Sequence, residues 1–131
     1  MHLRVDPSSL LPPSQQIVAW VLDAIACGEL VAGDKLPSVR GLAAEALVNP
    51  NTVTKAFRDL ERMGATEGRN GTGVFVTSGG PEVARGIRLA ETLSQFEAAM
   101  QMALRAGHEP AVLQQRFDEL VGKRETSGVK R

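Results

Sequence analysis

The sequence is poor in cysteine and carries no net charge. Cys27 is the only cysteine among 131 residues, so an intrachain disulfide is excluded and a reducing compartment is expected. Lys plus Arg and Asp plus Glu both number 15, which gives a formal net charge of zero. This balance argues against indiscriminate binding to polyanions. It leaves room for a local basic face, because binding depends on where the charges lie.

Long apolar segments are also missing. No apolar run approaches the roughly 18 residues that a membrane-spanning helix needs. The opening residues, MHLRVDPSSLLPP, lack the apolar core of a signal peptide. Together with the single cysteine, these features lead us to expect a cytoplasmic protein with no membrane partner.

Clusters of residues that carry chemistry are scarce. His2 and His108 have no Cys, Asp or Glu at metal-ligand spacing, and the Ser, His and carboxylate residues form no triad signature. The glycines of GRNGTG are not followed by the Gly-Lys-Ser/Thr of a phosphate-binding loop. We therefore expect no catalytic residue, no metal and no cofactor, and hence no enzyme.

What the chain does have is apolar residues at helical spacing, divided by helix start and stop signals. A first helix starts at Gln15 and stops at Gly28. Ser38 is placed to cap a short helix over residues 39–46, and Asn49 to cap a third helix that begins at Pro50. The third helix is expected to bury one stripe, made of Val53, Ala56, Phe57, Leu60 and Met63.

A β-hairpin and two further helices are predicted after Gly64. Asn70-Gly71 is a tight-turn pair, and the VFV that follows favours a strand. From Pro81 a helix with a heptad seam is predicted, and a break at Gly107 and Pro110 separates it from a last helix. Near the N-terminus, LRV is consistent with a short strand or an arm. The patterns divide the chain into residues 1–78, residues 79–124 and a disordered tail over 125–131.

These elements predict a mainly α fold class with a small β-hairpin: a winged helix-turn-helix domain followed by a C-terminal two-helix dimerisation tail. The plan suits DNA, because a helix about 10–12 Å wide fits the major groove while a hairpin beside it can touch the flanking backbone or minor groove. Between Lys35 and Arg58, four basic residues face a single acidic one, Glu45. The neutral chain is therefore predicted to carry a local basic strip.

The motifs resemble those of one known family. The run GELVAGDKLPSVRGLA from Gly28 to Ala43, the NTV that opens the third helix and the hairpin end GTGVFV from Gly71 to Val76 resemble the N-terminal DNA-binding domain of the GntR family of bacterial transcription regulators. The lead VDPSS, the variant NPNTV and the short two-helix tail further resemble the YtrA subfamily. Members of that subfamily are small dimeric repressors, which often control their own operon and a neighbouring ABC transporter.

The resemblance implies roles for individual residues. Arg40 matches a family arginine that contacts DNA, and Gly71 matches the wing-tip glycine that approaches the minor groove. Pro50 and Thr54 stand where family members carry arginines, which leaves base readout to uncharged side chains. The candidate DNA-binding residues are Ser38, Arg40, Asn49, Asn51, Thr52, Lys55, Arg58, Arg69, Asn70, Gly71 and Thr72.

A tail of about 50 residues has too little interior to bury two apolar stripes by itself, so homodimerisation is expected. The candidate dimer-interface residues are Leu89, Leu93, Phe96, Met100, Leu113, Phe117 and Leu120. The expected function is a sequence-specific, homodimeric repressor bound to double-stranded DNA with an inverted-repeat operator. The alternative is a winged-helix protein-interaction module without specific DNA binding. An unidentified small-molecule effector is allowed for, although no polar cluster in the sequence points to one.

Overall fold

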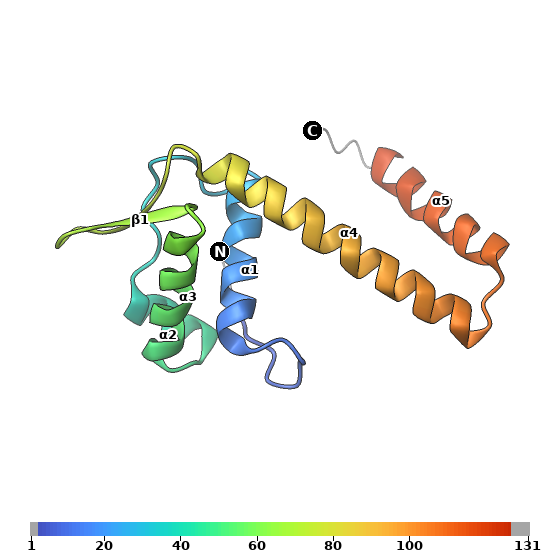
Figure 1. Cartoon of the computed structure of the whole chain (residues 1–131), viewed down its shortest axis with the longest axis horizontal. Coiled ribbons are helices and arrows are strands. Elements are labelled where there is room, and N and C mark those ends of the chain that lie inside the picture. The colour runs from blue at the N-terminus through green and yellow to red at the C-terminus, as the bar shows by residue number, and fades with distance from the viewer. Residues whose placement is uncertain (1–2, 127–131) are drawn as a thin grey trace. The chain divides into compact units, whose positions relative to one another are not determined.

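The computed structural model describes residues 3–126, which form five helices and two strands (Figure 1). The elements are α1 (Pro13–Ala26), α2 (Val39–Ala46), α3 (Pro50–Arg62), β1 (Thr66–Arg69), β2 (Gly73–Val76), α4 (Gly80–Ala106) and α5 (Pro110–Thr126). The chain divides into two compact units, Met1–Ala90 and Glu91–Arg131. The tail predicted over 125–131 lies outside the described residues from position 127 onward, and His2 also lies outside them.

Local capping chemistry sets the helix boundaries in the first unit. The Ser38 side chain accepts a hydrogen bond from the Gly41 N–H, which starts α2, and the Asn49 side chain accepts one from the Asn51 N–H, which starts α3. Between the two helices Leu47 turns the chain through the left-handed region, with a φ of 61°. Both predicted caps and the predicted bounds of α2 are confirmed.

The helices of the first unit pack α3 against both α1 and α2 around one apolar core (Figure 1). Four residues of the predicted α3 stripe are buried: Val53, Ala56, Phe57 and Leu60. The prediction for Met63 was wrong, because its side chain is 39% exposed. The helix ends at this residue and the chain turns away at Gly64, whose φ is 87°, so that Ala65 enters the core in its place.

The wing consists of the antiparallel strands β1 and β2, with Thr66 opposite Val76 and Arg69 opposite Gly73. The Thr72 N–H donates to the Arg69 carbonyl at 3.0 Å and closes the turn. The second edge of β2 is also occupied, by residues 33–36. The Leu36 N–H donates to the Val74 carbonyl, and the segment forms a β-bridge that pairs Lys35 with Phe75. The chain before α2 therefore runs along the wing.

Two further segments complete the first unit. At the N-terminus the buried Leu3 donates its N–H to a Glu45 carboxylate oxygen at 2.8 Å, so LRV is an arm and not a strand. At the other end the first turns of α4 join the core, since Gly80 and Ala84 are buried. Arg88 Nε lies 2.6 Å from Asp23 Oδ1 and thereby ties α4 to α1.

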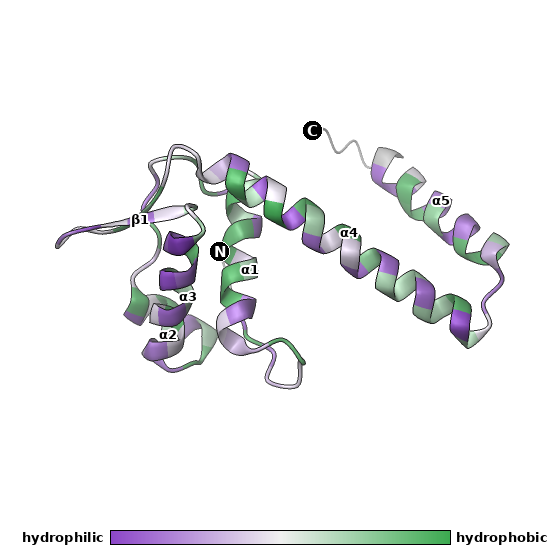
Figure 2. Ribbon diagram, viewed as in Figure 1, coloured by the Kyte–Doolittle hydropathy of each residue, from purple (hydrophilic) through white to green (hydrophobic). Residues whose placement is uncertain are grey.

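The second unit contains the C-terminal part of α4 and helix α5. The two helices touch through Phe96 and Phe117, whose ring centroids lie 6.4 Å apart. Gly107, with a φ of 107°, ends α4 as predicted. Figure 2 shows apolar residues along both helices, and much of this surface is exposed, including Leu93, Met100 and Leu120. Within residues 3–126, no helix is both long and apolar enough to cross a membrane.

Candidate nucleic-acid interface

Helix α3 presents a polar stripe on the side opposite its buried face, and its ribbon is largely hydrophilic in Figure 2. Asn51, Lys55 and Arg58 follow one another at spacings of four and three residues, so their side chains lie on one line along the helix. All three are exposed, and Thr52 beside them is partly exposed. Amides, hydroxyls and cations on one exposed helix face are the groups that hydrogen-bond base edges and phosphates.

The start of α3 divides its uncharged residues into two roles. The Asn49 side-chain oxygen is engaged by the Asn51 N–H at 2.8 Å, so Asn49 builds the helix start. Ser38 has the same role at α2, where its hydroxyl oxygen accepts the Gly41 N–H at 3.0 Å. The side chains of Asn51 and Thr52 are not used in this way in the described structure and remain available for an external partner.

The cations of the predicted strip differ in their pairing. Lys55 lies 3.7 Å from Asp59, and the same carboxylate accepts a hydrogen bond from Arg62 at 3.0 Å. Within the described residues, Arg40 and Arg58 form no ion pair. Exposed ion pairs are worth little, so Lys55 can exchange Asp59 for a phosphate at small cost. Glu45, the acidic residue within the strip, binds the N-terminal arm through the Leu3 N–H.

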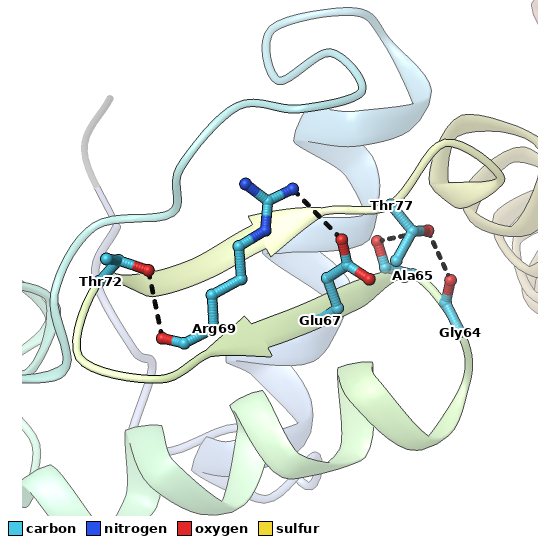
Figure 3. A network of polar contacts seen from close by, with 6 residues as sticks. All are labelled: Gly64, Ala65, Glu67, Arg69, Thr72 and Thr77. Carbon is cyan, nitrogen blue, oxygen red and sulfur yellow. Dashed lines mark hydrogen bonds and ion pairs between the residues drawn. The ribbon is translucent and has the colours of Figure 1, made fainter.

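The wing supplies a second group of candidate residues. Arg69 stacks its guanidinium 4.2 Å from the centre of the Phe75 ring and contacts Glu67 at 3.3 Å, and Figure 3 shows Arg69 and Glu67 rising from the same face of β1. Asn70, Gly71 and Thr72 are exposed at the tip. The contact of Arg69 with Phe75 was not predicted from the sequence. The alternation of side chains along paired strands could have indicated it.

All eleven candidate DNA-binding residues lie in the first compact unit. Of the candidate interface residues, Leu89 belongs to the first unit, whereas Leu93, Phe96, Met100, Leu113, Phe117 and Leu120 belong to the second. In the part of the chain that is described, no three His, Cys, Asp or Glu side chains are grouped so as to hold a metal ion.

Three helices followed by a two-stranded wing, with a polar outer face on the third helix, define a winged helix-turn-helix protein of the DNA-binding class. The profile of the family described as "Bacterial regulatory proteins, gntR family" matches residues 13–76. The chain belongs to this family of transcription regulators, which is not a family of enzymes.

Similar proteins support this assignment. The chain is 41% identical over 75 residues to the HTH-type transcriptional repressor YtrA of Bacillus subtilis (strain 168), a match that covers 57% of this chain and 58% of that protein. The chain thus spans little more than half the length of this curated relative. It is also similar to the solved structure of YtrA from Sulfolobus acidocaldarius, a GntR-family transcription factor, with 32% identity and a TM-score of 0.57 over 72% of this chain and 99% of that one.

Two further solved structures bear on the fold and on the ligand. A GntR family transcriptional regulator from Listeria monocytogenes superposes with a TM-score of 0.72 at 27% identity, over 87% of this chain and 97% of that chain. A match of this length extends beyond the winged domain into the C-terminal helices. AraR(DBD) in complex with operator ORX1 superposes with a TM-score of 0.54 at 29% identity, over 59% of this chain and 99% of that chain.

Proposed function

We propose that this protein is a homodimeric, cytoplasmic transcription repressor that binds an inverted-repeat operator in double-stranded DNA. From the resemblance to the YtrA subfamily described in the sequence analysis, we propose that it controls its own operon and a neighbouring ABC transporter. The observation that carries the proposal is the line of Asn51, Lys55 and Arg58 on the exposed face of α3. The operator complex of the similar AraR domain supports DNA as the ligand.

The candidate residues divide between affinity and sequence discrimination. Arg40, Lys55 and Arg58 supply phosphate contacts, because their charges are exposed and are either unpaired among the described residues or only weakly paired. Asn51 and Thr52 discriminate between base pairs, at about 1–3 kcal/mol for a good contact. Ser38 and Asn49 hold the two helix starts, so their contribution is to orient the neighbouring N–H groups. Arg69, Asn70, Gly71 and Thr72 contact the DNA flanking the recognition helix.

Dimerisation is assigned to residues 79–124 and DNA binding to residues 1–78, with the first turns of α4 packed on the DNA-binding part. The exposed apolar side chains of α4 and α5 support this division, because two helices alone cannot bury them. Two copies of α3, brought together by the dimer, match the two half-sites of an inverted repeat.

The Arg40→Ala variant tests the proposal. Loss of a charged contact to phosphate should weaken operator binding by roughly tenfold or more. Binding is measured by gel shift on a duplex selected from a randomised library. The oligomeric state, measured by sedimentation, should not change. Arg85→Ala, which removes an exposed arginine from α4, is the matched control.

The wild-type protein separates the proposal from the alternative function. Several phosphate contacts make the affinity for DNA fall steeply with salt concentration. If wild-type protein does not bind any selected duplex, or binds with no salt dependence, the chain is a protein-interaction module instead. If Arg40→Ala binds as tightly as wild type, the assignment of Arg40 is wrong.

A further inference from the structure

Two cations lie on one face of the wing, and only one of them, Arg69, is among the candidate residues above. The second is Lys35, which precedes α2 and lies beside β2 through its bridge to Phe75.

Lys35 crosses the wing at Gly73. A Cβ atom added to Gly73 would lie 2.6 Å from Lys35 Cε and 3.5 Å from Lys35 Nζ. The lysine stem therefore occupies the space that a side chain at position 73 would fill, and the ammonium group is held close to the strand. Gly73 also has a φ of 129°, which disfavours other residues there.

Arg69 lies on the same face of the wing as Lys35. Gly73 and Phe75 are two residues apart on β2 and thus project to one side of the sheet. Arg69 pairs with Gly73 across the hairpin, and its guanidinium covers the Phe75 ring at 4.2 Å. The positive groups of Lys35 and Arg69 consequently lie beside Gly73 and Phe75 on one exposed face of the wing. Figure 3 shows the Arg69 side chain on this face.

The pairing of these two charges is incomplete. Arg69 contacts Glu67 at 3.3 Å, whereas Lys35 forms no ion pair within residues 3–126. Both side chains are already partly ordered, Lys35 by its packing on Gly73 and Arg69 by its stacking on Phe75, so little side-chain entropy remains to be lost on binding. Two partly ordered cations, of which only Arg69 contacts a carboxylate, leave an excess of one positive charge on this face, which suits a singly charged oxyanion.

We propose that Lys35 and Arg69 together bind one backbone phosphate of the DNA duplex, with Lys35 as a DNA-binding residue contributed by the segment before α2. The inference rests on the proposed function, because the phosphate belongs to the operator. When the phosphate binds, Arg69 exchanges its weak contact with Glu67 for it, and Lys35 gains its first counter-ion.

The experiment measures the salt dependence of DNA binding by Lys35→Met. Methionine keeps an apolar stem over Gly73 and removes the charge, so the fold should be retained. Loss of one phosphate contact makes the slope of log affinity against log salt about 0.9 less steep. When the salt concentration rises from about 50 to about 200 mM, the fold-decrease in affinity should therefore be roughly three times smaller for the variant than for wild type. The probe is a duplex of about 30 base pairs, selected by wild-type protein, which is long enough for two half-sites.

Controls separate this contact from other causes. Lys35→Arg should keep the wild-type slope, and Arg85→Met on α4 should also keep it, since it removes a charge outside the wing. Lys35→Gln repeats the test should the Met variant fold poorly. Glu67→Gln should raise the affinity, because it removes the carboxylate that competes with the phosphate.

The outcomes distinguish the inference from the proposed function. The Lys35 site is wrong if wild-type protein binds with steep salt dependence and Lys35→Met shows the same slope of log affinity against log salt. That result leaves the proposed DNA-binding function intact. An equal loss of slope in Lys35→Met and Arg85→Met also overturns it, because the effect would then follow net charge. An affinity of Glu67→Gln that does not rise contradicts the exchange at Arg69. Failure of wild-type protein to bind any duplex overturns the proposed function itself.

Discussion

Two threonines at the base of the wing have opposite hydrogen-bonding states. Thr66 is 2% exposed, and its hydroxyl has no hydrogen-bond partner among the described residues. Thr77 donates its hydroxyl to the Gly64 carbonyl at 2.7 Å and approaches the Ala65 carbonyl at 3.3 Å (Figure 3). A buried polar group without a partner costs free energy, whereas a satisfied one contributes to stability.

The same substitution at both positions should therefore act with opposite signs. Thr66→Val should raise the free energy of unfolding by about 1 kcal/mol, because valine has nearly the same shape and no unsatisfied hydroxyl. Thr77→Val should lower it by about 1 kcal/mol through the lost hydrogen bond. Urea denaturation followed by circular dichroism measures both. Destabilisation by Thr66→Val would indicate that the Thr66 hydroxyl has a partner in solution.

Single residues also show which parts of the interface a sequence can reveal. Ser38 and Asn49 were predicted as caps, since a cap acts on N–H groups two or three residues away. The engagement of Glu45 by the Leu3 N–H joins positions 42 residues apart, and no local pattern indicates it. Two further features also required the side chains of the structure: Arg40 forms no ion pair within residues 3–126, and Asp59 competes for Lys55.

At the level of elements, α4 contains two glycines in contrasting surroundings. Gly80, at the first turn, is buried, and a Cβ there would lie 2.7 Å from the Ala65 carbonyl oxygen and 2.8 Å from Val76 Cγ1. Gly86 is exposed, and a Cβ there would meet nothing within 4 Å. The first glycine is required by close packing between α4 and the wing base, and the second is not.

Alanine at each position tests this difference. Gly80→Ala should destabilise the protein by about 1–3 kcal/mol, because a methyl group overpacks the contact with backbone. Gly86→Ala should stabilise it by roughly 0.5–1 kcal/mol, because alanine is the better helix former. Thermal denaturation of both variants gives the comparison. A neutral Gly80→Ala would mean that α4 shifts freely at its start.

The helices and strands themselves were largely predictable from the sequence, but the contacts between distant segments were not. The bounds of α2, the start of α3 at Pro50 and the break after α4 follow from caps, proline and glycine, which act locally. The pairing of residues 33–36 with β2 was not predicted, because that segment contains two turn residues and no strand pattern. The ion pair of Arg88 with Asp23 joins residues 65 positions apart and was not predicted from the sequence either.

At the level of the whole molecule, the proposed dimer depends on one face of α4. Leu93 is 57% exposed on the predicted seam, and Met102 is 65% exposed nine residues later, which places it on the opposite side of the helix. The two side chains are similar in size, so Met102 provides a matched control for a charge placed at Leu93.

Leu93→Glu should dissociate the dimer, with an affinity between subunits lower by about a hundredfold or more, because an unpaired carboxylate would be buried in each copy. Met102→Glu should leave the dimer intact. Sedimentation equilibrium distinguishes the 14.0 kDa chain from a species of twice that mass. A monomeric Met102→Glu together with a dimeric Leu93→Glu would place the interface on the other face of α4.

The hydrogen bond between Thr77 and Gly64 also has a consequence for how the chain can diverge or be redesigned. It joins the two residues between which the hairpin leaves and rejoins the body of the domain, and the Thr77 N–H adds a second link to the Ala65 carbonyl. The base of the hairpin is therefore held together by these bonds, independently of the sequence at its tip. Insertions or exchanged sequences at Asn70–Thr72 can alter the reach of the wing while the recognition helix and the start of α4 keep their places.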